Sequence, residues 1–382
     1  MPARRYAGSV DYAGPVVRSL YLHVPFCPSV CPYCDFHKML RHEGLVARYL
    51  ERLEDEARAL AERYPGPFDT VYFGGGTPSH LSDHELERVT TGLERAFGFP
   101  GRLETTLEAD PLTFTPERLR RFRDLGFDRL SIGLQSTQDA VLRFLGRVHD
   151  GKQGMQAVAW ALASGLRVNA DVITAVPGQD AALDLRRVAD TGVGHMSVYS
   201  LTIEPNTPFA LRGVRVDPER EADDFEATAP LLASYGLARY EVSNYARPGD
   251  EARHNLAAWR GAFYLGLGPS ASSHLPEGGA FGTRLRNPPI RAWLEGAPPE
   301  RDVLDAEGVL LERLLTGLRT REGVDLPGLR SLTGLGPEDV APRWLDDALR
   351  HRLLERDATR LRATDDGIAR LDALLRAFVR AS

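Results

Sequence analysis

Cysteine and lysine are scarce in this chain of 382 residues, which has three cysteines and, as lysines, only Lys38 and Lys152. A small, odd number of cysteines in so long a chain argues against a disulfide framework. The formal net charge is −6, so no overall basic field is present to attract nucleic acid. We interpret the low lysine content as a compositional bias, because arginine supplies the remaining positive charge.

Long apolar runs are also missing. No stretch of about 18 apolar residues occurs, so we expect no membrane-spanning helix. Residues 1–18 contain Arg4 and Arg5 but no apolar core of a signal peptide, so we expect no secretory signal. Unpaired thiols without such a signal predict a reducing, cytoplasmic location.

The three cysteines lie within eight positions, in the stretch Cys27-Pro28-Ser29-Val30-Cys31-Pro32-Tyr33-Cys34. Three thiolates on one short loop can ligate three corners of a cubane iron–sulfur cluster and leave the fourth iron open to a substrate. A zinc site of the three cysteines with His37 or His23 is the alternative, although the chain has no second Cys-x2-Cys knuckle. The loop follows a short buried strand at 19–25.

Strand-like and helix-like segments then alternate along about 215 residues. The expected strands are 19–25, 70–73, 104–109, 129–135, 167–174 and 195–201, and the expected helices are 44–64, 82–97, 116–125, 139–145, 152–164, 180–190 and 218–235. Such alternation predicts an α/β fold with a parallel sheet covered by helices. Six units favour a partial (β/α)6 barrel, while a doubly wound open sheet would show the same periodicity.

Four regions follow from this pattern. We expect a flexible arm at 1–18, the barrel at 19–246, an extension with a His-Asn loop and a linker at 247–305, and a mainly helical domain at 306–382. Prolines and glycines between 275 and 305 favour the linker. Helices with a short hairpin at 354–364 indicate a winged-helix-like C-terminal domain.

Polar residues fall where the expected strands end, which is where such barrels place their active sites. Gly74-Gly75-Gly76-Thr77 follows the second strand, and Glu108 and Gln135 end the third and fourth. Arg147 comes shortly after, and Asp171 lies on the fifth strand. A cation, two acids and an amide thus converge with the cysteine loop.

The cysteine spacing, with Tyr33 before the last cysteine, resembles the radical S-adenosylmethionine superfamily. The flanks Tyr21-Leu22-His23-Val24-Pro25-Phe26-Cys27 and Cys34-Asp35-Phe36 resemble the HemN/HemW family of haem-related proteins. Gly-Gly-Gly-Thr-Pro-Ser after the second strand matches this family as well, and the resemblance spans roughly residues 19–380. It implies a radical-SAM barrel with a [4Fe-4S] cluster held by Cys27, Cys31 and Cys34, and S-adenosylmethionine as a second cofactor.

The resemblance also implies roles for residues around S-adenosylmethionine. The glycine carbonyls and Glu108 would receive the ammonium, Arg147 the carboxylate, and Gln135 with Asp171 the ribose hydroxyls. Tyr33 would pack on adenine. The full implied set is Tyr21, Tyr33, Gly75, Gly76, Thr77, Glu108, Gln135, Arg147 and Asp171.

A second motif bears on haem. HemW-type proteins have His-Asn-x-x-Tyr-Trp, and this chain has His254 and Asn255 with Trp259, but Ala258 in place of the tyrosine. Ala252 stands where many relatives have a cysteine. The resemblance makes His254, Asn255 and Trp259 candidates for binding haem, and a hydrogen-bonded structural role for His254 is the alternative.

Two functions compete within the family. The HemN type is an oxygen-independent coproporphyrinogen III dehydrogenase, with a further cysteine where this chain has Phe36 and a longer N-terminal extension. We therefore expect the HemW type, a haem chaperone that binds haem and transfers it to acceptor proteins, without dehydrogenase activity. A non-catalytic haem carrier with a structural cluster is a third reading.

The expected partners follow from the same resemblance. They are haem, haem-acceptor proteins, a reductant such as flavodoxin or ferredoxin for radical chemistry, and, by peripheral contact, membrane-bound haem proteins. No nucleic acid is expected. The chain is expected to be a monomer or a cluster-dependent dimer.

Overall fold

A twelve-stranded sheet organises the protein, whose structure is a computed structural model that describes residues 16–381. The strand order is β14-β13-β12-β11-β1-β4-β5-β6-β7-β8-β10-β9. The arm expected at 1–18 lies outside the described residues as far as residue 15.

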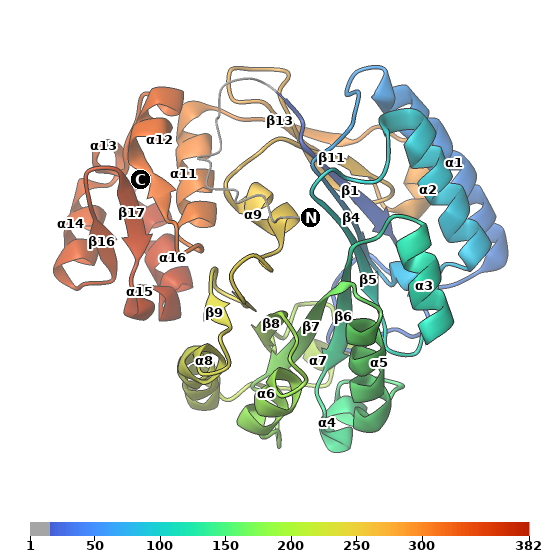
Figure 1. Cartoon of the computed structure of the whole chain (residues 1–382). Helices are drawn as coiled ribbons and strands as arrows, with labels where there is room; N and C mark the ends of the chain where they lie inside the picture. The colour runs from blue at the N-terminus through green and yellow to red at the C-terminus, as the bar shows by residue number, and fades with distance from the viewer. Residues whose placement is uncertain (1–15, 382) are drawn as a thin grey trace.

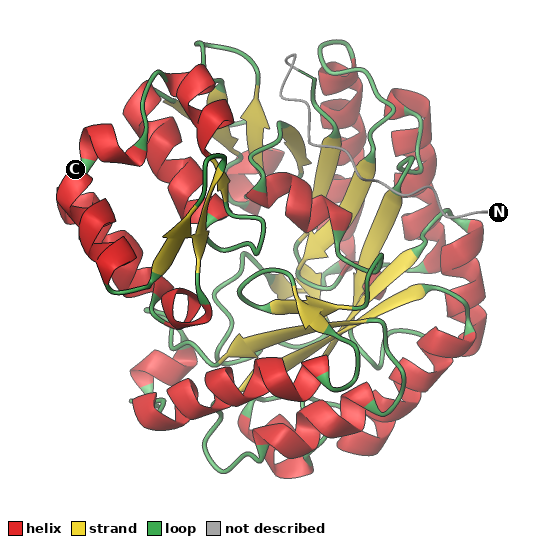
Figure 2. Ribbon diagram, turned by 60° about the vertical axis from the view of Figure 1, so that its left-hand side comes forward, coloured by secondary structure: helices red, strands yellow, loops and turns green. Residues whose placement is uncertain are grey.

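The six expected strands pair in parallel and in sequence order, which confirms the partial (β/α)6 barrel. They are β1 (Ser19–Val24), β4 (Thr70–Gly75), β5 (Glu104–Ala109), β6 (Arg129–Gln135), β7 (Arg167–Thr174) and β8 (His195–Ser200). The connecting helices are α1 (Glu43–Ala61), α2 (Asp83–Phe97), α3 (Pro116–Asp124), α4 (Asp139–Phe144), α5 (Gly151–Ala163), α6 (Ala181–Ala189), α7 (Pro208–Leu211) and α8 (Pro218–Ala233). Figures 1 and 2 show the sheet as a crescent with most of these helices along its outer side.

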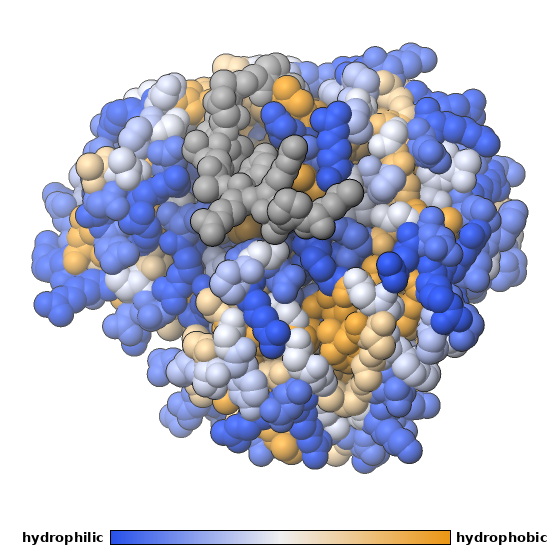
Figure 3. Space-filling view, in the orientation of Figure 1, coloured by the Kyte–Doolittle hydropathy of each residue, from blue (hydrophilic) through white to orange (hydrophobic). Residues whose placement is uncertain are grey.

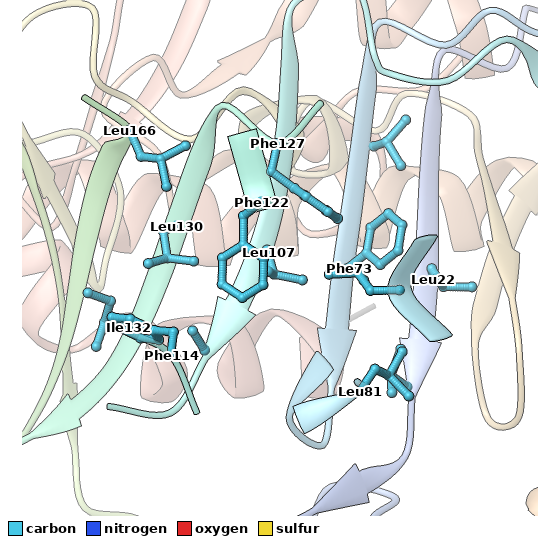
Figure 4. Packing of buried hydrophobic residues seen from close by; sticks show 14 of the residues in the cluster. Leu22, Phe73, Leu81, Leu107, Phe114, Phe122, Phe127, Leu130, Ile132 and Leu166 are labelled. Atoms are coloured by element: carbon cyan, nitrogen blue, oxygen red, sulfur yellow. The ribbon is translucent and has the colours of Figure 1, made fainter. Parts of the chain in front are cut away.

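Strand residues alternate between the two faces of this crescent, as the pleat requires. The outward residues are apolar and pack under the helices, as Figure 4 shows for Leu22, Phe73, Leu107, Leu130 and Ile132. Burying them excludes water from the helix–sheet layer, which supplies most of the stabilisation of such a fold. The inward residues are largely polar, so the concave side is the place for chemistry.

The sheet extends beyond the expected barrel at both edges. β11 (Tyr264–Leu267) pairs in parallel with β1, and an antiparallel series of β12 (Ser272–Leu275), β13 (Thr283–Arg286) and β14 (Glu300–Val303) follows. At the other edge, β10 (Asn244–Ala246) runs antiparallel to β8 and pairs with β9 (Ala238–Arg239).

The prediction of a linker within 275–305 is therefore wrong, because the stretch forms regular secondary structure. This stretch contains β13, α10 (Ile290–Leu294) and β14. Trp293 is buried beneath α1, where its indole Nε1 donates a hydrogen bond to Glu56 at 3.2 Å. The prolines and glycines mark turns between short strands.

The expected His-Asn loop is also wrong, because this segment forms the short helix α9 (Arg253–Trp259) on the concave side (Figure 1). The buried carboxylate of Glu104 accepts hydrogen bonds from the backbone N–H groups of Arg253 at 3.2 Å and His254 at 3.0 Å. Free N–H groups at the start of a helix need such acceptors. A residue from a distant strand thus stabilises the helix.

The C-terminal domain has its own apolar core and lies beside the barrel (Figure 1). Its elements are α11 (Ala306–Gly317), β15 (Val324–Asp325), α12 (Leu326–Thr333), α13 (Pro337–Val340), α14 (Pro342–Arg350), β16 (Leu354–Arg356), β17 (Arg360–Ala363), α15 (Asp365–Ala369) and α16 (Leu371–Ala381). β16 and β17 form the expected hairpin, and β15 completes a small antiparallel sheet. This order of helices followed by a hairpin is winged-helix-like.

Three further structural elements frame the cysteine loop. β2 (Phe26–Cys27) and β3 (Met39–Leu40) pair in parallel, and the short 3-10 helix η1 (Pro78–His80) follows β4.

Within residues 16–381, no helix combines the length and the apolar character needed to cross a bilayer. Figure 3 shows a largely hydrophilic surface on the face in view, with a hydrophobic patch over the region where Figure 1 labels β6 and α7.

Candidate functional site

A cavity of about 390 Å³ lies on the concave side of the barrel and reaches its carboxyl-terminal rim. All three cysteines line it, together with every residue of the expected cofactor set except Tyr21. These residues are Cys27, Cys31, Cys34, Tyr33, Gly75, Gly76, Thr77, Glu108, Gln135, Arg147 and Asp171. Residues predicted on six different strands or loops thus meet in one space.

The cysteine loop is closed at its base by the pairing of β2 with β3. Cys27 and Cys31 are buried, whereas Cys34 is partly exposed. The ammonium of Lys38 donates to the carbonyl oxygens of Cys34 and Phe36, which holds the end of the loop. The loop therefore presents its thiols to the cavity from a fixed backbone.

The donor set fits an iron–sulfur cluster better than a single zinc ion. The ring of His23 is bonded on both nitrogens, at 3.1 Å to the hydroxyl of Tyr21 and at 2.8 Å to the carbonyl of His37. The Nε2 of His37 accepts from the backbone of Ile290 at 3.2 Å. Both ring nitrogens of His23 and the Nε2 of His37 are thus engaged, so either imidazole could complete a Cys3His zinc site only by breaking one of these hydrogen bonds or, for His37, through its Nδ1.

The glycine triplet requires glycine for steric reasons. Gly75 has φ +111°, and a Cβ there would come within 2.5 Å of the His23 ring. A Cβ on Gly76 would meet the backbone of Pro25 at 2.8 Å. The hydrogen bonds from Gly76 N to Val24 O, at 2.8 Å, and from Thr77 N to Phe26 O, at 2.9 Å, bring this turn against the start of the cysteine loop. Only glycine allows this approach.

Glu108 lies at the end of β5 and is held by two donors. The hydroxyl of Tyr72 donates to its Oε1 at 2.7 Å, and the backbone N–H of Gly75 donates to its Oε2 at 3.1 Å. Burial, opposed by the Tyr72 hydrogen bond and reinforced by the charge of Asp171, raises the pKa of Glu108 to about 7. Its charge is therefore sensitive to pH near neutrality.

Gln135 has a backbone conformation that side chains other than glycine rarely adopt, with φ +66°. It follows an irregularity in the pairing of β6 with β7, between Ile132 and Gln135. A left-handed conformation costs roughly 1–2 kcal/mol at a residue with a Cβ. Such strain is typical of functional sites, and here it places the amide nitrogen of Gln135 beside Gly133 at the cavity wall.

Arg147 has an internal partner that the sequence did not reveal. Its Nη2 donates to Asp110 Oδ2 at 2.6 Å and to the carbonyl of Gly133 at 2.9 Å. Its Nη1 donates to the sulfur of Cys31 at 3.4 Å, and its Nε has no partner among the described residues. The guanidinium therefore links the loop after β5 to the cysteine loop through hydrogen bonds.

Asp171 belongs to a polar network in the barrel interior. Ser131 donates to its Oδ2 at 3.2 Å, and Asn169 donates to its Oδ1 at 2.8 Å. Burial raises the pKa of Asp171, although these donors oppose the shift. Sequence reasoning missed this network, although alternate residues of β6, β7 and β8 are polar, as in Arg129, Ser131, Asn169, His195 and Ser197.

The two expected tyrosines differ in position. Tyr33 lines the cavity and packs against Phe209 of α7, with ring centroids 6.3 Å apart. Tyr21 does not line this cavity. Its ring stacks on that of Tyr72 and borders a separate cavity of about 320 Å³.

The three haem candidates are not brought together. His254 is buried, and its Nδ1 is 2.9 Å from the hydroxyl of Thr70. It borders the smaller cavity, whereas Asn255 borders the larger one and Trp259 lines neither. Burial lowers the pKa of His254 to about 4, so its ring is neutral at physiological pH.

Comparison with known proteins agrees with this geometry. The Radical SAM superfamily matches residues 21–184, and the HemN C-terminal domain matches residues 304–370. The solved structure of coproporphyrinogen III oxidase (HemN) from Escherichia coli has the same fold, with a TM-score of 0.82 over 96% of this chain and 91% of that chain, at 23% identity. The barrel and its cysteine loop are those of a radical S-adenosylmethionine protein.

Sequence relatives identify the family within the radical S-adenosylmethionine proteins. Heme chaperone HemW of Escherichia coli is 34% identical over 376 residues, which cover 94% of this chain and 98% of that protein. Heme chaperone HemW of Lactococcus lactis is 31% identical, over 91% of this chain and 94% of that protein. The chain belongs to the HemW family, and the resemblance seen in the sequence is confirmed.

Proposed function

We propose that this protein is a haem chaperone of radical S-adenosylmethionine architecture, which binds haem and transfers it to acceptor proteins. The observation that carries the proposal is membership of the HemW family, in which the curated relatives are named heme chaperones. Phe36 agrees with it: this residue is 63% exposed at the cavity entrance, where the dehydrogenase type has a further cysteine.

We assign the cluster to Cys27, Cys31 and Cys34, whose thiols face one cavity. When bound and reduced, a [4Fe-4S] cluster would supply the electron that cleaves the sulfonium of S-adenosylmethionine. Burial raises the pKa of the Cys27 thiol to about 11, so the free loop holds this thiol protonated at neutral pH. Cluster assembly must therefore release protons.

The remaining cavity residues would bind S-adenosylmethionine. Glu108 would accept from its ammonium, and Arg147 would pair with its carboxylate while keeping the bond to Asp110. Asp171 and Gln135 would bind the ribose hydroxyls. An ionised acceptor strengthens such hydrogen bonds, which favours this division of roles.

For haem, the proposal retains His254, Asn255 and Trp259 as candidates, and histidine is a common axial ligand of haem iron. A neutral imidazole at His254 is compatible with ligation. The acceptors would be haem proteins of the same cell, and a flavodoxin or ferredoxin would serve as reductant if S-adenosylmethionine is cleaved. The working location in this proposal is the cytoplasm.

The deciding experiment separates chaperone from dehydrogenase. Reconstituted protein titrated with haem should give a Soret change at about one haem per chain. The same protein, given coproporphyrinogen III, S-adenosylmethionine and a reductant under anaerobic conditions, should form no protoporphyrinogen. Robust turnover would contradict the haem-chaperone proposal and support dehydrogenase activity. Haem binding without any methionine release would favour a haem carrier with a structural cluster.

A second prediction concerns pH. If Glu108 must be ionised to accept the ammonium, affinity for S-adenosylmethionine should fall as pH drops through the Glu108 pKa of about 7. We expect binding up to about tenfold tighter at pH 8 than at pH 6, with a decline above about pH 8 as the amino group of the ligand loses its proton.

Calorimetric titration of the holoprotein across this range measures the effect. Glu108→Gln is the matched control, because it keeps an acceptor at the same place but cannot titrate. The variant should bind more weakly, with the rise between pH 6 and 8 removed. An equal rise in the variant would assign the pH dependence to another group and would reject Glu108 as the acceptor.

A further inference from the structure

A chain of hydrogen bonds runs from Asp171 in the cavity to the start of α9. The Asn169 amide nitrogen is 2.8 Å from Asp171 Oδ1, and the Asn169 Oδ1 is 2.6 Å from His195 Nδ1. The His195 Nε2 is 2.8 Å from the hydroxyl of Tyr240, which accepts from the backbone N–H of Ala252 at 3.3 Å. Ala252 is the residue immediately before α9.

Chemistry fixes the direction of every bond in this chain. The Asn169 amide nitrogen donates to Asp171 Oδ1 and also lies 2.7 Å from the Ser131 hydroxyl and 2.9 Å from the Ser197 hydroxyl, so its NH2 group faces this polar network. The Asn169 oxygen then faces His195, whose Nδ1 must hold the ring proton. The Nε2 of a neutral His195 can only accept, so the Tyr240 hydroxyl donates to it.

The surroundings keep His195 neutral. The residue is 1% exposed, and burial, followed by the nearby cations Arg129 and Arg167, lowers its pKa well below the usual value. All donors between Ala252 and Asp171 therefore point toward the carboxylate. Hydrogen bonds aligned in one direction polarise and strengthen one another.

We propose that Asn169, His195 and Tyr240 are positioning residues that orient the Asp171 carboxylate toward the ribose hydroxyls of the nucleoside ligand. None of the three was expected from the sequence to take part in the site. The inference rests on the proposed binding of S-adenosylmethionine and deepens it. Ser131 holds Asp171 Oδ2 at 3.2 Å, and the chain of bonds through Asn169 holds Oδ1, so the two together fix the plane of the carboxylate.

The test compares two ligands on the reconstituted holoprotein. S-adenosylhomocysteine has both ribose hydroxyls, and its 2′,3′-dideoxy analogue has neither. A hydrogen bond to a charged group is lost with the analogue, so the wild type should prefer the first ligand by about tenfold or more. A merely structural role of His195 would weaken both ligands alike.

His195→Phe keeps a buried ring but breaks the chain, while Ser131 still donates to Asp171. The preference should therefore fall clearly below the wild-type value, and the affinity for the dideoxy analogue should stay unchanged. His195→Gln should restore the preference, because its amide can donate to Asn169 and accept from Tyr240. A tenfold preference that persists in a folded His195→Phe protein would overturn the inference and leave the proposed cofactor site intact. Wild-type protein that binds neither ligand would overturn both.

A measurement on the unchanged protein covers the case in which His195→Phe does not fold. Nitrogen-15 spectra of the holoprotein should show His195 as the neutral tautomer with its proton on Nδ1. The opposite tautomer, or an imidazolium near neutral pH, would overturn the inference.

Discussion

Cys31→Ala should yield a folded chain that assembles no [4Fe-4S] cluster. The chain has only three cysteines, and all of them line the same cavity. His23 has both ring nitrogens hydrogen-bonded elsewhere, and the Nε2 of His37 accepts from the backbone of Ile290, so we expect neither imidazole to replace the missing thiolate. Loss of one thiolate should therefore abolish the visible absorption and the iron content after anaerobic reconstitution.

Phe36→Ala is the matched control for this variant. Phe36 lies on the same loop, is exposed and is not a ligand, so its replacement should leave the iron content unchanged. Circular dichroism should show equal helix content for both variants. A Cys31→Ala protein with four irons per chain would refute the ligand assignment, and one tightly bound zinc in the wild type would refute the cluster.

The sequence predicted the barrel well because its signals are local. Outward residues such as Leu130 and Ile132 alternate with polar ones on every central strand, and the helices show regular apolar spacing. The residues expected at strand ends converge because parallel strands end at the same rim. The convergence of Glu108, Gln135 and Asp171 could therefore be predicted from the topology of the sheet alone.

The errors arose where stability is non-local. The strands β12 to β14 have four residues each, too short for a clear period, and β14 is exposed along its whole length. α9 has seven residues, and its start is stabilised by Glu104, about 150 positions away along the chain. Glycines and prolines in these stretches favour a loop or linker when only neighbours in sequence are considered.

Partners inside the site were missed for the same reason. Tyr72 donates to Glu108 across neighbouring strands, and Asp110 accepts from Arg147 across 37 positions. Sequence can nominate a charged residue at a strand end, but not the buried group that balances its charge. The pairing of Arg147 changes what its removal should do.

Arg147→Ala should impair both folding stability and cofactor binding. The side chains of Arg147 and Asp110 are only 11% and 8% exposed, and their ion pair is 2.6 Å long. Removing one partner of a buried pair leaves an uncompensated charge, so we expect a loss of about 3–5 kcal/mol in the free energy of unfolding. Loss of the proposed bond to the ligand carboxylate should weaken S-adenosylmethionine binding by about tenfold or more.

The double variant Arg147→Ala/Asp110→Asn separates these two effects. The asparagine carries no charge and retains an oxygen for the backbone N–H of Leu112, which is now 3.0 Å from Asp110 Oδ1. Much of the lost stability should therefore return in urea unfolding. The affinity measured by calorimetry should not return, because the cation that we propose as the partner of the ligand carboxylate is still missing. Recovery of both in the double variant would mean that Arg147 acts only through Asp110, and that the ligand carboxylate binds elsewhere.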